Sequence, residues 1–372
     1  MVSILVSILG LALLMVVHEA GHLVAARAFG MRVITFSIGF GPTFFKIQPS
    51  DGYFWLTFLA GRVRLRLHKH DPERHGPTVY QVAMIPFLAY VQIAGMNPFE
   101  EIDPDDKGSY ANASLLGRIT TIIAGPLANY LFASVLFFFS FYHGGVIVHP
   151  EVRGTDVNVM ADHPAEAAGL KDGDKIVEVD GEAVSTWSEM AKRISSHPGE
   201  PVDIVVEREG GRLTFVITPK EHSDGRGIIG VESRGQRKEV GASEAAWLAI
   251  SKPPVVVKNL IVGLGKWISG KVEAELGGPV MIIKEGARAV RHGLADWLLL
   301  LGALSAYLGA FNLFPFPALD GGRLMFLGYE LTTRRRPNAK VEAHVHVVGL
   351  MMLIGLMLYV TIFNDLNLGG GK

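Results

Sequence analysis

The chemically most informative residues lie near the N-terminus, in the run His18-Glu19-Ala20-Gly21-His22. If this run is helical, His18 and His22 lie one turn apart on one face, where two imidazoles can bind one Zn²⁺. Glu19 is rotated around the helix from His18, and it is placed to activate a bound water as a general base. Such a short pattern also occurs by chance, so the interpretation needs a suitable setting and a third ligand.

The setting of these residues is apolar. The stretch from Met1 to Val17 has no charged side chain. It has no basic start and no small-residue cleavage site, so we expect a retained membrane span and not a signal peptide. Ionisable residues in such a span are costly and usually serve a function.

A candidate third ligand lies far downstream, in the run N-L-F-P-F-P-A-L-D-G-G that begins at Asn312. Asp320 closes an uncharged stretch, Trp297–Leu319. Pro315 and Pro317 are expected to stop or unwind that helix and to let the carboxylate turn towards the metal. The alternative is an ordinary membrane helix that ends at a proline-rich turn, with Asp320 in a hydrated loop.

The two motifs together resemble those of the site-2 protease family of intramembrane metalloproteases, in particular its bacterial RseP-like branch. The chain differs at Leu88-Ala89-Tyr90, where relatives commonly carry Gly-Gly-Tyr, and at Arg323, which is often His. These differences bear on the substrate channel and not on the zinc chemistry. Further matches are FSIGFGP at Phe36–Pro42, AGPLAN at Ala124–Asn129, and Gly278-Pro279.

The resemblance implies a Zn²⁺ cofactor held by His18, His22 and Asp320, with Glu19 as the general base. It also implies that the substrates are single-span membrane proteins cut within or near the membrane segment. These would be anti-sigma factors already clipped outside the membrane, or remnant signal peptides.

Composition supports a membrane protein, since 49% of the 372 residues are hydrophobic. A span needs about 20 apolar residues, and four uncharged runs approach that length. The absence of cysteine excludes disulfides and thiolate metal ligands. The net charge of −1 argues against a nucleic-acid partner. The four runs are the N-terminal one continuing past His22, Ile119–Tyr142, Trp297–Leu319 and Val347–Phe363.

Basic residues next to the runs predict the orientation. Two loops, between the first and second runs and between the third and fourth, are rich in Lys and Arg and should face the cytoplasm. We therefore expect a multi-pass protein of the bacterial inner membrane, with both termini on one side. The basic residues are Arg27, Arg32, Arg62, Arg64, Arg66, Lys69 and Arg74 in the first loop, and Arg334, Arg335, Arg336 and Lys340 in the second.

Two segments between the first two spans are typical of strands. Arg62–His68 alternates polar and apolar residues, and Val33–Ile38 is rich in β-branched residues and is followed by Gly39 and Gly41. They predict a sheet that dips into the membrane interface near the metal. The alternative is a surface-lying hairpin with no role in substrate binding.

The charged segment from Val146 to Val231 breaks the membrane pattern and resembles one PDZ domain. It is expected to contain a helix over Ser185–Ser195 and a hairpin formed by Val202–Arg208 and Arg212–Thr218. PDZ domains bind peptide or protein termini at a sheet edge. Ile228, Ile229 and Gly230 could form the binding turn and strand, or could be an ordinary final strand. By topology this domain lies on the periplasmic side.

The predicted fold is a polytopic α-helical membrane protein with four transmembrane helices, a membrane-associated β-hairpin or sheet, and an inserted α+β PDZ-like domain. Residues 233–293 are interpreted as interfacial helices and connector, because Ala242–Leu264 mixes polar and apolar positions and contains Pro253-Pro254. The domains are 1–145 (first membrane part), 146–232 (PDZ-like), 233–293 (connector) and 294–372 (second membrane part).

The function that these features favour is intramembrane zinc endopeptidase. Asn312 could bind the substrate backbone or the developing oxyanion, or could join helices, and Asn129 is better explained by helix–helix hydrogen bonding. A non-catalytic membrane scaffold that binds exported proteins through its PDZ-like domain is the alternative, but a scaffold has no need of Glu19. A zinc transporter would need a second polar path through the spans.

Overall fold

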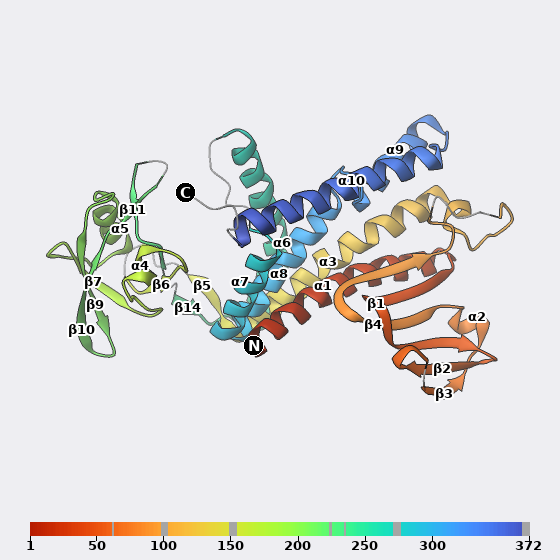
Figure 1. The fold of residues 1–372 in the computed structure, drawn as a ribbon, viewed down its shortest axis with the longest axis horizontal. Helices are drawn as coiled ribbons and strands as arrows, with labels where there is room; N and C mark the ends of the chain where they lie inside the picture. The colour runs from red at the N-terminus through yellow and green to blue at the C-terminus, as the bar shows by residue number, and fades with distance from the viewer. Residues whose placement is uncertain are drawn as a thin grey trace. The chain divides into compact units, whose positions relative to one another are not determined.

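The computed structural model describes residues 1–61, 63–97, 103–148, 155–222, 225–233, 236–270 and 277–366. Arg62 in the first predicted strand and residues 271–276 in the predicted connector lie outside these ranges. The chain forms two compact units, Met1–Gly144 with Gly241–Lys372, and Gly145–Val240 (Figure 1). We describe each unit by itself.

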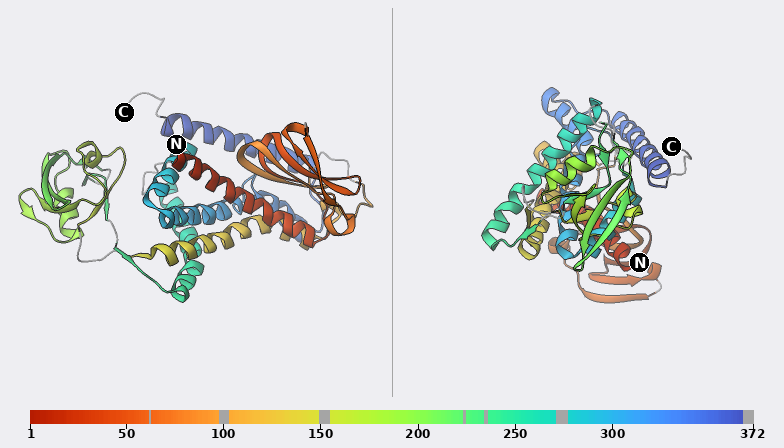
Figure 2. Two further views of the ribbon diagram at one scale, coloured as in Figure 1. Left: turned by 90° about the horizontal axis from the view of Figure 1, so that it is seen from below. Right: turned by 90° about the vertical axis from the view of Figure 1, so that its left-hand side faces the viewer.

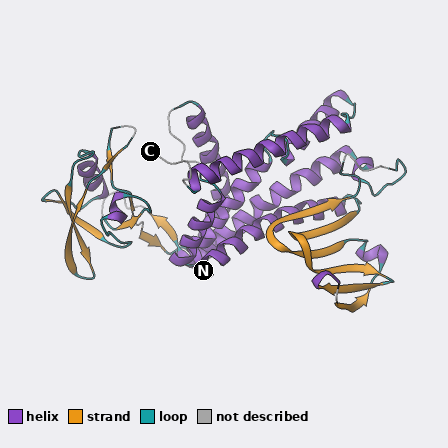
Figure 3. Cartoon of the chain, in the orientation of Figure 1, coloured by secondary structure: helices purple, strands orange, loops and turns teal. Residues whose placement is uncertain are grey.

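The first unit is mainly helical (Figure 3). Helices α1, α3 and α8 pack side by side around Leu14, Leu136 and Leu301, as the left-hand view of Figure 2 shows. The side chains of this core are apolar, as expected of helices in a membrane. The long helices are α1 (Val2–Ala28), α3 (Leu115–Gly144), α6 (Ala242–Ile268), α7 (Pro279–His292), α8 (Leu294–Asn312), α9 (Asp320–Thr333) and α10 (Ala339–Val360).

Among the described residues of this unit, five helices are long and apolar enough to cross a membrane: α1, α3, α6, α8, and α10 with its extension to Asp365. The sequence predicts four, because Ala242–Leu264 is interpreted as an interfacial helix plus connector. In the structure α6 runs without a break through Pro253 and Pro254. A helix can continue past proline at the cost of the missing backbone hydrogen bond. The fold class is confirmed in outline, and the count of four is not.

The chain between α8 and α9 leaves the helical path, as the prolines predict. Helix α8 ends at Asn312, residues 313–319 form a tight loop, and α9 begins at Asp320. Gly321 and Gly322 pack directly on the backbone of this loop, where a Cβ atom would collide with carbonyl groups. Asp320 is therefore fixed at the start of a helix and does not lie in an open loop.

The sheet of the first unit has the strand order β3-β2-β1-β4. The start of β1 lies between the two ends of β4, since Thr35–Ile38 pairs with both Val79–Val82 and Ala89–Gln92. Helix α1 packs against β4, which brings the sheet to the helix that carries His18 and His22. The elements are β1 (Val33–Ser50), β2 (Tyr53–Phe58), β3 (Val63–Lys69), the short helix α2 (Pro72–His75) and β4 (Val79–Ile93).

The second unit is a small α+β domain with its own core. Its main sheet has the order β10-β9-β7-β8, and α5 packs against β7. Ile176, Ile204 and Met190 are almost fully buried in that core. Its elements are β5 (Val146–Val148), β6 (Val157–Val159), α4 (Pro164–Ala167), β7 (Lys175–Val179), β8 (Glu182–Ala183), α5 (Trp187–Ser195), β9 (Val202–Arg208), β10 (Gly211–Ile217), β11 (Lys220–Glu221), β12 (Gly227–Ile228), β13 (Val231–Ser233) and β14 (Gln236–Lys238).

The local signals of the second unit match these elements closely. Helix α5 begins after Thr186, whose hydroxyl accepts the Glu189 N–H, while the Glu189 carboxylate accepts the Thr186 N–H. Such a capping box satisfies two N–H groups at the helix start. The predicted hairpin is β9 and β10, paired from Val202↔Ile217 to Arg208↔Gly211.

Candidate metal centre

His18 and His22 lie on the buried face of α1, with 5% and 6% of their surfaces exposed. Their Nε2 atoms are 3.2 Å apart. Two glycines let α3 approach this face of α1. A side chain at Gly21 would collide with the backbone of Ala124, and one at Gly125 would collide with the His22 ring. The close contact of the two helices thus encloses the imidazoles.

Asp320, the first residue of α9, reaches the same point. Its Oδ2 atom lies 3.1 Å from His18 Nε2 and 3.3 Å from His22 Nε2. Across the described ranges, these three side chains are the one group of His, Asp or Glu whose ligand atoms are close enough to share a metal ion. Residues separated by about three hundred positions in the sequence therefore meet at one point.

The spacing of these atoms fits zinc. Zn–N and Zn–O bonds of about 2.0–2.2 Å in tetrahedral geometry place the ligand atoms about 3.3–3.5 Å apart. The observed separations are 3.1, 3.2 and 3.3 Å. Three protein ligands leave a fourth position for water or substrate, which is the arrangement of catalytic zinc sites.

The hydrogen bonds around the cluster also favour a cation. His22 Nδ1 lies 2.7 Å from the Thr121 carbonyl oxygen, and a carbonyl can only accept, so Nδ1 donates. A neutral His22 then presents the Nε2 lone pair to Asp320. The Asp320 Oδ2 atom is buried and has no hydrogen-bond donor within the described part of the chain. Acceptor atoms converging in a buried space require a positive charge between them.

His18 has a comparable outer contact with Asn129 of α3. The Asn129 side chain is fully buried, and its Nδ2 atom lies 3.3 Å from His18 Nδ1. The Asn129 Oδ1 atom has no partner among the described residues. Exchanging the two amide atoms, which have nearly the same shape, gives Oδ1 the His18 Nδ1–H as a donor. In this orientation Asn129 Oδ1 accepts from His18 Nδ1–H, and His18 Nε2 is left free to bind metal.

Glu19 lies beside the ligands and is held by the sheet. Its Oε2 atom accepts the Val91 N–H of β4 at 2.9 Å. One carboxylate oxygen is thereby fixed, and the other is left for a water molecule. The contact joins the candidate base directly to the strand beside the metal centre.

The remaining predicted site residues are placed differently. Asn312 is the last residue of α8 and is half-buried, and the loop that follows it ends at Leu319. Ile228, Ile229 and Gly230 belong to the second unit. Ile229 is 2% exposed and packs in that unit's core, and its carbonyl accepts the N–H of Ala165.

The contacts of Thr121 and Val91 were not predicted from the sequence, and Asn129 was assigned to helix–helix hydrogen bonding. The AGPLAN run located Asn129, but only the fold shows its contact with His18. Thr121 and Val91 act through backbone atoms, so their side chains carry no signal of the role. His346 of α10, which bonds to the loop before Asp320, also has no local signal.

Comparisons with known proteins identify the family. The sequence profile of Peptidase family M50 matches residues 6–76 and 66–356, which is most of the chain. The chain belongs to peptidase family M50. Zinc metalloprotease RasP of Geobacillus kaustophilus is 30% identical over 404 residues, with 94% of each chain covered. A protein of Agrobacterium fabrum, provisionally named a zinc metalloprotease, is 29% identical, with 97% of this chain and 94% of its own covered.

Among solved structures, the PDZ domain of an SdrC-like protein from Listeria monocytogenes is 27% identical. It covers 23% of this chain and 90% of its own length, with a TM-score of 0.19.

The predicted resemblance to the site-2 protease family is confirmed by this M50 membership. The protein is a zinc metallopeptidase of a bacterial membrane, and the predicted Zn²⁺ cofactor is confirmed at the level of the family.

Proposed function

We propose that this M50 peptidase cleaves single-span membrane proteins within or near their membrane segment, in regulated intramembrane proteolysis. The observation that carries the proposal is the convergence of His18 Nε2, His22 Nε2 and Asp320 Oδ2 inside a helical unit apolar enough to lie in a bilayer. Substrates of the anti-sigma factor type, already trimmed outside the membrane, and remnant signal peptides fit this chemistry.

In this proposal His18, His22 and Asp320 hold zinc, which supplies Lewis-acid polarisation of the scissile carbonyl when bound. Glu19 accepts a proton from the attacking water and passes it to the leaving amine. The Val91 N–H keeps the Glu19 carboxylate pointing to the reaction centre. Since Glu19 is not a ligand, its role and the metal binding are separable.

A helical substrate hides its peptide bonds, so it must be extended before it is cut. Strand β4 ends beside Glu19, and its backbone is placed to hold an extended substrate by main-chain hydrogen bonds. Asn312, at the end of α8, is proposed to bind the substrate backbone or the developing oxyanion.

For the membrane topology we propose four spans, α1, α3, α8 and α10, with the HEAGH end facing the cytoplasm. Helix α6 is the least apolar of the five candidates, and Lys252, Lys258 and Lys266 favour the membrane interface. Residues 146–232 are then extracytoplasmic. There they act as a PDZ-like module that binds peptide or protein termini near Ile228, Ile229 and Gly230.

The test compares two carboxylate variants of the purified full chain. Glu19→Gln should retain zinc and lose cleavage by about 10²–10⁴-fold, because general-base catalysis is removed while all ligands remain. Asp320→Asn should lose zinc itself, while Asp105→Asn, an exposed control, should lose neither. The measurements are zinc content and cleavage of model membrane segments. Normal cleavage by Glu19→Gln would show that Glu19 is not the general base. A wild-type protein that binds no zinc would favour the alternative of a non-catalytic membrane scaffold.

A further inference from the structure

Helix α10 contacts the loop that precedes Asp320 through a side chain outside the ligand set. The N–H of Ala318 donates to His346 Nδ1 at 2.9 Å. Ala318 has φ of 75°, in the left-handed region that an alanine rarely adopts. It lies two residues before Asp320, so its backbone angles set the direction in which the carboxylate leaves the loop.

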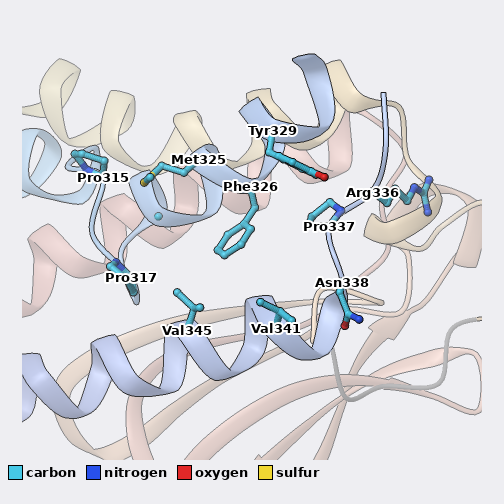
Figure 4. Close-up of a pocket in the computed structure, with 11 residues that line it drawn as sticks. Pro315, Pro317, Met325, Phe326, Tyr329, Arg336, Pro337, Asn338, Val341 and Val345 are labelled. Carbon is cyan, nitrogen blue, oxygen red and sulfur yellow. The ribbon is translucent and has the colours of Figure 1, made fainter. Parts of the chain in front are cut away.

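The contact between α10 and this loop is narrow. Gly349, one turn beyond His346, packs against Pro317 so closely that a Cβ atom would overlap the proline. A cavity of about 510 Å³ lies on one side, between α9 and α10, with Phe326 pointing into it (Figure 4). A second cavity of about 330 Å³ also borders Pro317. Next to these cavities, Gly349 and His346 bring α10 into contact with the loop.

The hydrogen bonding of His346 indicates that its Nδ1 atom is the functionally important group. Because Ala318 N–H donates, Nδ1 must accept, and the proton of the neutral ring sits on Nε2. The Nε2 atom is buried and lacks a partner among the residues that the structure describes. An unpaired buried donor is unfavourable, and an apolar side chain would fill the same space without that cost. A histidine here therefore serves the Ala318 contact and not packing alone.

We propose that His346 is a positioning residue for the metal centre. By accepting the Ala318 N–H, it holds the loop in its left-handed conformation and keeps Asp320 Oδ2 on the two histidines. This inference rests on the proposed function, since it assumes that Asp320 is a zinc ligand. His346 itself does not contact the ligand atoms.

The test is a set of isosteric variants of the full chain in detergent. Asn carries its oxygen near the place of histidine Nδ1, so His346→Asn should keep zinc affinity close to wild type. His346→Leu removes the acceptor, and His346→Gln places its amide near Nε2, so both should bind zinc about 10–100-fold more weakly, as losses of outer contacts do. Zinc affinity is measured by competition with a chelator. At saturating zinc, KM should stay unchanged in all variants.

His344→Leu is the matched control, because its Nδ1 bonds within α10 to the Lys340 carbonyl and not to the loop. It should bind zinc as wild type does. Thermal unfolding of the metal-free proteins checks that each variant is folded. Native zinc affinity in His346→Leu, or equal losses in the Asn and Leu variants, would overturn the inference. Failure of the wild type itself to bind zinc would instead overturn the proposed function.

Discussion

At the scale of residues, the proposed metal centre depends on which ring nitrogen of each histidine faces inward. Thr121 accepts from His22 Nδ1, and the Asn129 amide lies on His18 Nδ1. Both contacts fix the ring orientation and leave Nε2 for the metal. The outer contacts therefore contribute to bringing the three ligand atoms together.

Asn129 gives the prediction at this scale. Asn129→Leu should weaken zinc binding by about 10–100-fold, because His18 loses the group that orients its ring. Asn129→Asp retains an oxygen that accepts from His18 Nδ1 and should bind zinc more tightly than the Leu variant. Chelator competition measures both affinities. Wild-type affinity in Asn129→Leu would assign the residue to helix packing.

At the scale of elements, α9 is anchored at both ends. Its first residue is Asp320, and near its last turn Glu330 accepts two hydrogen bonds, at 2.6 and 2.9 Å, from Arg118 of α3. The two side chains are 8% and 11% exposed, so the pair is largely withdrawn from water. Since α3 also carries Thr121 and Asn129, this ion pair connects the helix of the proposed third ligand to the helix that contacts both histidines.

A double-mutant cycle tests that anchor. Glu330→Leu alone should lower the free energy of unfolding by about 3–5 kcal/mol, because it leaves the buried Arg118 guanidinium without its carboxylate. Arg118→Met should lower it by less, because Glu330 keeps Arg336 at 3.7 Å. The double variant should be more stable than either single one. The exposed pair Arg193–Glu182 is the control and should contribute about 0–1 kcal/mol. Denaturant unfolding in micelles measures these values, and additive losses would show that the two charges do not interact.

The second unit contains a further ion pair, which predicts its pH dependence. Asp174 is 1% exposed and accepts from Arg208 through both carboxylate oxygens at 2.7 Å. Burial by itself would raise the pKa of Asp174, but Arg208 and the Lys171 N–H outweigh it and hold the pKa below its usual value. The stabilisation is complete above the ordinary pKa of about 4 and is lost as the pH falls through the lower folded value.

The unfolding temperature of residues 145–240 should therefore fall as the pH drops below about 4. Asp174→Asn should be less stable at pH 7 and should show a flatter profile over that range, because the titrating group is gone. Calorimetry at a series of pH values measures both. An identical slope in the variant would assign the pH dependence to other carboxylates.

At the scale of the whole molecule, the chain enters and leaves the second unit through one ladder. Strand β5 pairs antiparallel with β14, from Val146↔Lys238 to Val148↔Gln236. The two ends of the insertion are thus neighbours, and the unit has its own core. It can be removed without stretching the chain that remains.

Deleting residues 149–235 and closing the ladder with a two-residue turn tests the division of labour. The shortened protein should keep zinc and cleave short membrane segments, because every candidate ligand and the base lie in the first unit. It should lose selectivity against substrates with intact external domains. Cleavage rates of trimmed and untrimmed substrates give the readout. A folded, zinc-loaded deletion protein that cleaves nothing would place the second unit in the catalytic machinery.

The sequence by itself determined the chemistry and the local structure. The spacing of His18 and His22 predicts a shared helical face because the helix repeat is a local property. The prolines before Asp320 predict the break between α8 and α9, and turn residues predict the β9–β10 hairpin. The family is also readable from the HEAGH and LDGG motifs, since both are short and contiguous.

Only the tertiary structure showed which residues distant in the sequence lie in contact. The contact of Asp320 with both histidines depends on how α1, α3 and α9 pack, and local patterns carry no information on distances across the chain. Val91 binds the Glu19 carboxylate through its backbone N–H. Every residue except proline has this group, so the residue type at position 91 could not predict the contact. The continuation of α6 through Pro253 and Pro254 was likewise not predictable from the local sequence, because prolines usually end a helix.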